Sequence, residues 1–279
     1  MKTWPWFALS FGAASIVAGV ACSLVVDTSG LAGGPSDSGA RDATPTDAAF
    51  DGFDAGADAR SDGGTTTWCG QQSNLAFCDD FDSPDANLKG RWDDAWMQSG
   101  TLRVDDQNPS SPPNALLAIV VSPPSSNGNG IQKVFPPHAS TRVATDLILE
   151  ASDTSGYGSF VEIHLEPLLA PYQDYRAALI YTGGEMTLDT YAQGGVGGSG
   201  SIKINRTFTS WRRVQLELAL TPTPHAVAYD GAGVVLATLP LPATMTRAGM
   251  GVTIGLPYLS GTSKAWQARL DNVAVTFGD

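Results

Sequence analysis

The sequence predicts an all-β protein built as a two-sheet antiparallel sandwich. From Trp68 onward, short runs with period-two alternation or β-branched residues are separated by clusters of Gly, Pro, Asn and Ser. No stretch sustains the 3.6-residue periodicity of a helix. Gly (31) and Pro (18) are abundant among the 279 residues and only 16% of residues are charged, a composition that disfavours helical bundles and coiled coils.

About fourteen strands are expected between residues 68 and 279. In chain order they are 76–81, 101–104, 115–121, 131–135, 141–150, 159–166, 175–181, 186–192, 201–205, 211–220, 225–229, 234–239, 249–256 and 265–277. Such a density of strands with turn residues between them is typical of two packed antiparallel sheets. In 211–220, alternation places Val214, Leu216 and Leu218 on one face and Arg213 and Glu217 on the other, so one side is expected in the core.

The charge balance narrows the classes of partner. The chain has 16 Lys and Arg against 28 Asp and Glu, a formal net charge of −12. A broad basic surface for phosphate groups is therefore absent from the composition. This argues against nucleic-acid binding and against other anionic partners.

Residues 1–21 have the features of a secretory signal, with Lys2 followed by an uncharged apolar run. Residues 18–22 read AGVAC, which resembles the lipobox of bacterial lipoproteins. The resemblance implies lipidation at Cys22, a membrane anchor, and export to the cell envelope as an outer-membrane or cell-surface lipoprotein. Gly19 stands where a lipobox usually has Leu, so two alternatives stay open. They are cleavage after Ala21 to give a soluble secreted protein, and an uncleaved anchor over the apolar run 4–26.

The next segment predicts a disordered acidic tether. Residues 27–67 consist almost wholly of Asp, Ala, Gly, Ser, Thr and Pro, with two Arg and eight Asp. Only Leu31, Phe50 and Phe53 are sizeable apolar residues, so burial cannot offset the loss of backbone entropy. The predicted organisation is a signal peptide at 1–21, a lipidated N-terminus and tether at 22–67, and the sandwich at 68–279.

The chain has three cysteines, and lipidation uses Cys22. The remaining pair, Cys69 and Cys78, fits a local disulfide in an oxidising compartment, worth about 2–3 kcal/mol in the chain-entropy picture. No other Cys and only three scattered His are present, which argues against a zinc site.

Three segments of the C-terminal third resemble the concanavalin-A-like and laminin-G-like jelly rolls. They read WRRVQLEL at 211–218, AVAYDGAGV at 226–234 and ARLDNVAV at 268–275. The start, FCDDFD at 77–82, resembles the first strand of many glycan-binding jelly rolls. Asp230 and Gly231 are expected to supply the positive φ angles of a tight hairpin turn. The resemblance covers residues 76–277 and implies the fold more than a function.

The strand 159–166 holds the sharpest candidate for chemistry. Alternation places Glu162, His164 and Glu166 on one face and Val161, Ile163 and Leu165 on the other. Glycoside hydrolases of the laminarinase and lichenase type use Glu-x-Asp-x-Glu on such a strand, with the outer Glu residues as nucleophile and acid/base. Here the middle residue is His164, so we expect no enzyme. A solvent-facing polar strand or a glycan-contacting face are the alternatives.

Two further groups are candidate ligand sites. Asp80, Asp82 and Asp271 are expected to meet if the terminal strands lie side by side, and related glycan-binding jelly rolls hold a structural calcium with such residues. Tyr157, Tyr172 and Tyr258 fall in Gly- or Pro-rich stretches, where stacking on sugar rings is a more natural role than packing.

We therefore expect a non-catalytic glycan-binding sandwich on an exported lipoprotein. A structural or protein-interaction module without a sugar site is the first alternative. A polysaccharide hydrolase or lyase that uses Glu162 and Glu166 is the second.

Overall fold

The computed structural model describes residues 67–83, 87–121, 127–165, 174–193, 199–241, 247–261 and 264–278. The chain divides into two units, residues 1–60 and 61–279, and every described residue belongs to the second unit. The predicted signal peptide, the lipidation site Cys22 and residues 22–66 of the tether lie outside the described residues.

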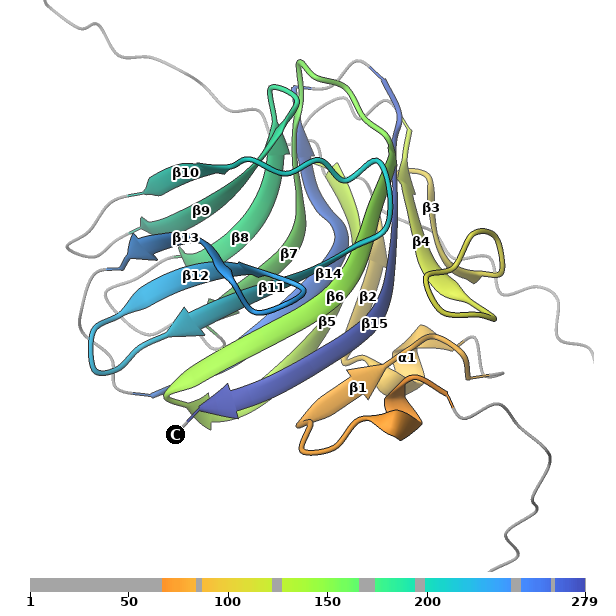
Figure 1. The fold of residues 1–279 in the computed structure, drawn as a ribbon. Helices are drawn as coiled ribbons and strands as arrows, with labels where there is room; N and C mark the ends of the chain where they lie inside the picture. The colour runs from red at the N-terminus through yellow and green to blue at the C-terminus, as the bar shows by residue number, and fades with distance from the viewer. Residues whose placement is uncertain are drawn as a thin grey trace, which may run out of the picture. The chain divides into compact units, whose positions relative to one another are not determined.

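Two antiparallel sheets pack face to face (Figure 1). The seven-stranded sheet has the order β10 (Gly200–Ile204), β9 (Glu185–Gln193), β8 (Asp174–Thr182), β7 (Tyr157–Leu165), β14 (Ala248–Ser260), β5 (Asn127–His138) and β2 (Asp94–Met97). The eight-stranded sheet has the order β13 (Val235–Pro240), β12 (His225–Asp230), β11 (Arg212–Ala219), β6 (Ser140–Ala151), β15 (Trp266–Gly278), β4 (Ala115–Val120) and β3 (Thr101–Asp105), and β1 (Phe77–Asp79) also pairs with β15. The fold class predicted from the sequence is confirmed.

The core lies between the sheets and is filled by alternate residues of both. On β11, Val214, Leu216 and Leu218 are buried while the neighbouring Arg213 and Glu217 are not, as the alternation predicts. The largest fully buried side chains include Trp92, Trp266, Tyr175, Phe81 and Phe160. These rings fill the space between two sheets that stack at about 10 Å.

Each predicted strand overlaps an observed one, and one observed strand was not predicted. β2 is short and has no β-branched residue. Its place depends on a contact in which the ring of Trp96 lies against Gly130 on the neighbouring strand β5. A Cβ on Gly130 would lie only 2.9 Å from that ring. Helix is limited, in the described chain, to the single turns η1 (Cys69–Gln71) and α1 (Leu88–Arg91). Neither turn is long and apolar enough to cross a membrane.

The N-terminal segment is fastened to the sandwich in two ways. Cys69 and Cys78 form a disulfide with their Cα atoms 5.8 Å apart, which confirms the predicted pairing. Cys78 lies on β1, and β1 pairs with β15, so the first and last strands lie side by side as predicted.

The hairpin between β12 and β13 differs from the prediction for Asp230 and Gly231. The positive φ angle, 81°, falls on Gly233. Asp230 instead closes the turn, because its Oδ1 accepts hydrogen bonds from the backbone N–H groups of Ala232 (3.0 Å) and Val234 (2.9 Å). Gly231 is needed for close approach, since a Cβ there would lie 2.9 Å from Cβ of Arg213.

Candidate functional site

One row of side chains crosses the whole seven-stranded sheet. The strand registers bring one residue from each strand directly opposite the next: Ser201, Asp189, Ala178, Glu162, Thr253, Gln132 and Asp94. Directly opposite residues in antiparallel strands point to the same face. Val161 and Ile163, which flank Glu162, belong to the hydrophobic core. The row therefore lies on the outer face of the sheet.

Two register shifts turn a pair of tyrosines to this same face. Phe160 and Val161 are consecutive on β7 and both belong to the core, and the register with β8 shifts between Ser159 and Val161. An extra residue of this kind reverses the alternation, so Tyr157 shares the outer face with Glu162. β14 shifts between Ile254 and Tyr258, with Leu259 again in the core.

The consequence is an aromatic pair on neighbouring strands. The rings of Tyr157 and Tyr258 meet edge to face, with centroids 5.8 Å apart. Burial raises the pKa of the Tyr157 hydroxyl above its ordinary value, and the negative charge of Asp189 raises it further. The hydroxyl therefore stays protonated and can donate a hydrogen bond.

A pocket of about 270 Å³ opens beside this pair. The side chains that matter for its chemistry are Tyr157, Glu162, Arg176, Asp189, Tyr191 and Tyr258. Ala178 lies between Asp189 and Glu162 in the row, and its methyl group leaves space that a larger side chain would fill. The pocket thus combines flat aromatic groups with hydrogen-bonding polar groups.

Arg176 is held at the pocket by its neighbours. Its Nη1 lies 3.6 Å from Oε2 of Glu162, and its guanidinium carbon lies 5.5 Å from the centroid of the Tyr191 ring. Arg176 and Tyr191 are directly opposite in the register of β8 and β9. Across β9 and β10, Ser201 Oγ donates a hydrogen bond of 2.7 Å to Oδ1 of Asp189.

His164 extends the polar face toward β5. Gln132 Nε2 donates a hydrogen bond to Nε2 of His164 at 2.7 Å, across the intervening strand β14. Gly251 makes this possible, since a Cβ there would lie 2.4 Å from His164 Nε2 and 2.9 Å from Gln132 Nε2. Glu162 and His164 therefore share the outer face, as the alternation predicts.

The predicted site residues are only partly brought together. Tyr157, Tyr258 and Glu162 line one pocket, whereas Glu166 and Tyr172 lie outside the described residues. Arg176, Asp189 and Tyr191 are pocket residues that were not predicted. Alternation along 175–181 and 186–192 places polar residues on one face of each strand, but only the sheet order shows that these faces meet beside β7.

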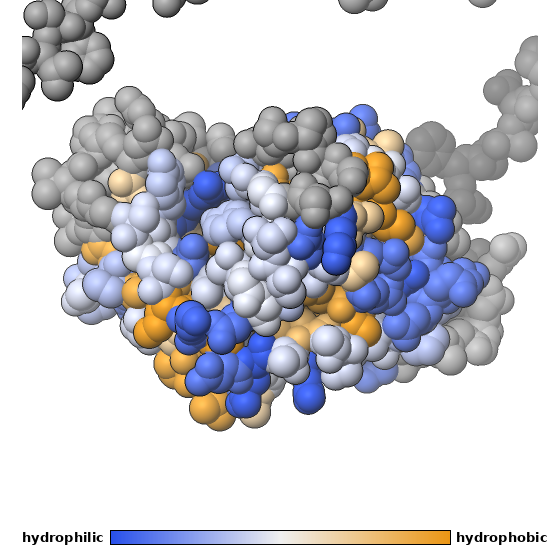
Figure 2. Space-filling model, turned by 90° about the horizontal axis from the view of Figure 1, so that it is seen from above, coloured by the Kyte–Doolittle hydropathy of each residue, from blue (hydrophilic) through white to orange (hydrophobic). Residues whose placement is uncertain are grey.

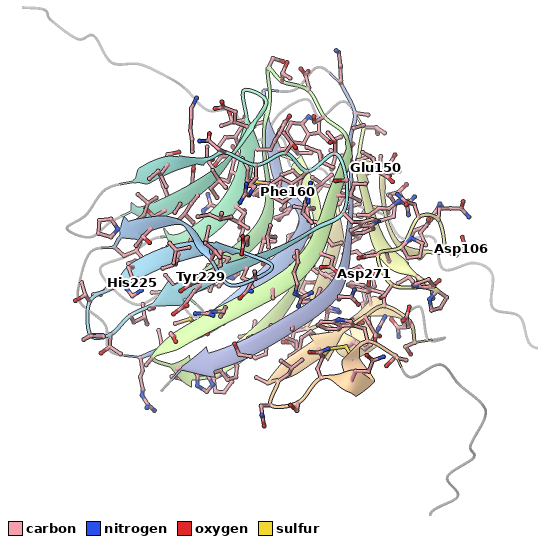
Figure 3. All side chains as sticks on the ribbon, viewed as in Figure 1. Asp106, Glu150, Phe160, His225, Tyr229 and Asp271 are labelled. Atoms are coloured by element: carbon pink, nitrogen blue, oxygen red, sulfur yellow. A yellow bond between two sulfur atoms is a disulfide. The ribbon has the colours of Figure 1, made fainter. Side chains whose placement is uncertain are left out.

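The carboxylates proposed for calcium are engaged by protein groups. Asp271, on β15 (Figure 3), accepts hydrogen bonds from the backbone N–H groups of Ser111 (2.8 Å) and Asn272 (2.7 Å). Asp82 Oδ1 accepts from Asn114 N–H (3.1 Å), and Asp80 Oδ2 accepts from Cys69 N–H (2.8 Å). No group of three or more His, Cys, Asp or Glu among the described residues could hold a metal ion. Calcium stays a prediction.

A larger hollow, of about 790 Å³, lies where the chain between β10 and β11 passes the β12–β13 turn. Its principal charged groups already contact other protein groups. Arg213 Nη1 donates to Oδ1 of Asp146 at 3.2 Å, and its guanidinium carbon lies 4.7 Å from the centroid of the Trp68 ring. Asp230 is occupied by its own turn. The pocket beside Tyr157 is therefore the better candidate for a ligand site.

The described chain is a two-sheet antiparallel jelly-roll sandwich with an aromatic and polar pocket on one outer face. No protein-family model and no curated protein sequence matches the chain. Among solved structures, it is similar to the marine PL-14 alginate lyase from Aplysia kurodai, with 9% identity, a TM-score of 0.54, and coverage of 74% of this chain and 100% of that one. It is also similar to a structure titled for endo-acting O-glycanases that members of the human gut microbiota express to initiate mucin breakdown. That similarity has 13% identity, a TM-score of 0.52, and coverage of 74% of this chain and 100% of the other. At these identities the similarities show the fold.

Proposed function

We propose that the protein binds glycan in the pocket beside Tyr157 and does not catalyse a reaction on it. The observation that carries the proposal is the Tyr157 and Tyr258 pair, turned outward beside Glu162, Arg176 and Asp189. Sugars bind to such sites because their C–H faces pack on aromatic rings while their hydroxyl groups hydrogen-bond to placed polar groups.

The structures that share the fold support glycan as the ligand class. One is titled an alginate lyase and the other is titled for O-glycanases that initiate mucin breakdown. A jelly-roll sandwich can therefore serve glycan recognition, although fold alone does not assign a function. The residues of the pocket carry the argument for this chain.

Binding without catalysis is supported by the surroundings of Glu162. Glu162 is 7% exposed, and its carboxylate faces the guanidinium of Arg176 at 3.6 Å. His164 stands where the Glu-x-Asp-x-Glu pattern has its middle Asp, and it is hydrogen-bonded to Gln132. In laminarinase-type enzymes the middle Asp tunes the nucleophile, and neither the Arg176 guanidinium nor the His164 imidazole is such a carboxylate.

A protein-interaction module is the alternative, and it would need an apolar surface patch. On the face seen in Figure 2, apolar residues gather in separate small groups with hydrophilic residues between them. Large exposed apolar residues of the described chain include Met97 on β2, Val121 just after β4 and Val234 just before β13. This distribution favours the pocket over a broad docking patch.

The proposal for location is export as a lipoprotein anchored through Cys22. The support is the AGVAC segment at 18–22 after an apolar run. Cys22→Ser is expected to move the protein from the membrane fraction to the soluble fraction. An intact Cys22→Ser protein that still needs detergent for release would point to an uncleaved anchor instead.

Co-sedimentation of the purified protein with insoluble polysaccharides, and affinity electrophoresis with soluble ones, test the binding proposal. Tyr157→Ala and Tyr258→Ala are each expected to weaken binding about tenfold, equivalent to about 1.4 kcal/mol. Tyr229→Ala is the matched control, because Tyr229 is a half-buried tyrosine on β12 of the other sheet (Figure 3).

Released reducing ends and unsaturated products are followed in the same assay. Product that disappears in Glu162→Gln would contradict binding without catalysis. Absence of binding to every polysaccharide, or equal loss in Tyr229→Ala, would contradict the glycan site itself.

A further inference from the structure

The pocket beside Tyr157 has an unusual balance of charge for a polysaccharide site. Among its described lining residues, Arg176 is the one Lys or Arg, whereas Glu162 and Asp189 are both carboxylates. The described lining therefore has one more negative than positive group.

The single cation is already engaged. Arg176 faces Glu162 at 3.6 Å and lies over the Tyr191 ring at 5.5 Å. A carboxylate on a ligand would have to compete with Glu162 for the same guanidinium. It would also approach Asp189, where like charges repel.

Asp189, unlike Arg176, is not paired with an oppositely charged group of the described chain. It is half-buried, and its one hydrogen bond from a described residue comes from the neutral hydroxyl of Ser201. No Lys, Arg or His of the described chain forms an ion pair with it. The pKa of Tyr157 is raised chiefly by burial and next by the negative charge of Asp189, whereas the charge of Arg176 lowers it and that of Glu162 raises it.

The segments between the described ranges cannot reverse this balance. Residues 84–86, 122–126, 166–173, 194–198, 242–246 and 262–263 contain no Lys and no Arg. Their charged residues are Asp85 and Glu166. Wherever these segments lie, they bring no cation to the pocket.

We propose that the pocket selects an amino sugar, with the protonated amine of a hexosamine bound at Asp189 and the sugar ring against Tyr157, and that it discriminates against uronates. This inference rests on the proposed glycan-binding function and adds the class of sugar. An ammonium group donates charge-assisted hydrogen bonds to a carboxylate, and Asp189 is the pocket carboxylate that no described cation neutralises.

Isothermal titration calorimetry of the full chain with short oligosaccharides tests the proposal. The ligands are glucosamine oligomers, the matched N-acetylglucosamine oligomers, neutral gluco-oligosaccharides and oligo-uronates, all in mildly acidic buffer where the free amines are protonated. The glucosamine oligomer is expected to bind at least about tenfold more tightly than its N-acetylated match, which corresponds to about 1.4 kcal/mol.

Asp189→Asn separates a specific amine contact from general attraction of cations to a chain of net charge −12. It is expected to abolish the tenfold preference for the free amine, measured as the ratio of the two affinities within the same variant. Asp106→Asn removes the same charge from an exposed residue after β3 and is expected to leave the preference unchanged (Figure 3). β3 and β13 are the two edge strands of the eight-stranded sheet, whereas the pocket strands β7 to β10 belong to the other sheet.

The possible outcomes distinguish this inference from the function on which it rests. If uronates or neutral oligomers bind as tightly as glucosamine oligomers, the amino-sugar inference is wrong and glycan binding stands. If the preference survives in Asp189→Asn, or falls equally in Asp106→Asn, the assigned contact is wrong. If no oligosaccharide of any class binds, both proposals fail.

Discussion

Arg269 and Asp105 form an ion pair of 2.6 Å in which both side chains are almost fully buried, with 7% and 5% of their surfaces exposed. The pair joins β15 to the segment at the end of β3. Arg269 Nε also donates to Oε1 of Glu150, at 3.0 Å, at the end of β6 (Figure 3). Burial alone would raise the pKa of Asp105, but hydrogen bonds from Arg269, Arg103 and the N–H of Gln107 lower it below its ordinary value.

Removal of Arg269 is expected to be costly. Arg269→Met leaves Asp105 buried without its principal partner, and breaking a buried pair in this way costs about 3–5 kcal/mol. Urea unfolding measures the free energy of unfolding. Arg103→Met is the matched control, because Arg103 binds the same carboxylate but its side chain is 62% exposed. The control is expected to lose less than about 1 kcal/mol. Equal losses in the two variants would contradict the role assigned to burial.

Gly251→Ala is expected to separate His164 from Gln132. The added methyl group would lie 2.4 Å from His164 Nε2, so the imidazole must move and its hydrogen bond to Gln132 is lost. We expect a loss of about 1 kcal/mol in unfolding free energy, since the displaced group is the end of a side chain. The loss should become smaller when Gly251→Ala is made in a His164→Ala background, where only Gln132 Nε2, 2.9 Å from the added methyl group, still has to move. Gly90→Ala is the control, because its nearest neighbour would be 3.8 Å away.

The Cys69–Cys78 disulfide is expected to contribute to stability through the short loop that it closes. Replacing both cysteines with Ser should lower the unfolding free energy by about 2–3 kcal/mol. A reductant should destabilise the parent protein and leave the double variant unchanged, which controls for lost packing of the sulfur atoms. Two alkylatable thiols in the non-reduced parent protein would contradict the bond itself.

The raised pKa of Asp271 predicts that the free energy of unfolding depends on pH in a specific direction. The pKa of Asp271 is raised from 3.8 to about 7, chiefly by burial. The N–H groups of Ser111 and Asn272 lower it, and the nearby charges of Asp82 and Asp146 raise it. Between these two pH values the folded chain holds a proton that the unfolded chain has released. Stability from this group is therefore complete below about pH 4 and is lost as pH rises to about 7.

Melting temperatures of the parent and Asp271→Asn between pH 4 and pH 8 test this sign. The variant should lose less stability across the interval, because it no longer carries the titrating carboxyl group. Asp79 and Asp82 also have raised pKa values, whereas those of Asp93 and Asp105 are lowered, so the comparison of variants isolates Asp271. Asp106→Asn should keep the slope of the parent. An Asp271→Asn slope equal to that of the parent would contradict the prediction.

Alternation of polar and apolar residues predicted the strands well because each strand buries one face against the other sheet. It did not predict β2, whose pairing depends on the contact of Trp96 with Gly130. It also could not predict that Tyr157 shares a face with Glu162, because the five-residue spacing places them on opposite faces of a regular strand. The register shift at Phe160 reverses that parity, and it depends on which residues the facing sheet can accommodate.

The candidate site shows the same division between local and non-local information. The polarity of Glu162 and His164 on one face follows from their own strand. The approach of Arg176, Tyr191 and Asp189 follows from the order β10-β9-β8-β7, which a single sequence does not specify. Consecutive strands joined by hairpins favour that order. The pocket also needs the small side chain of Ala178 between the carboxylates of Glu162 and Asp189.

The Cys69–Cys78 bond also decides how the sandwich bears mechanical load. Tension that enters the described chain at residue 67 reaches Cys69 and crosses the sulfur atoms directly to Cys78 on β1, so residues 70–77 carry none of it. The force then falls on the short β1–β15 ladder, where Cys78 is opposite Ala274 and Asp79 is opposite Val273. Asp79 is braced behind this ladder by Trp92 Nε1, which donates to its Oδ2 at 2.7 Å. Tension on the N-terminal side of the described chain is therefore expected to load the β1–β15 ladder before it loads the seven-stranded sheet that holds the pocket.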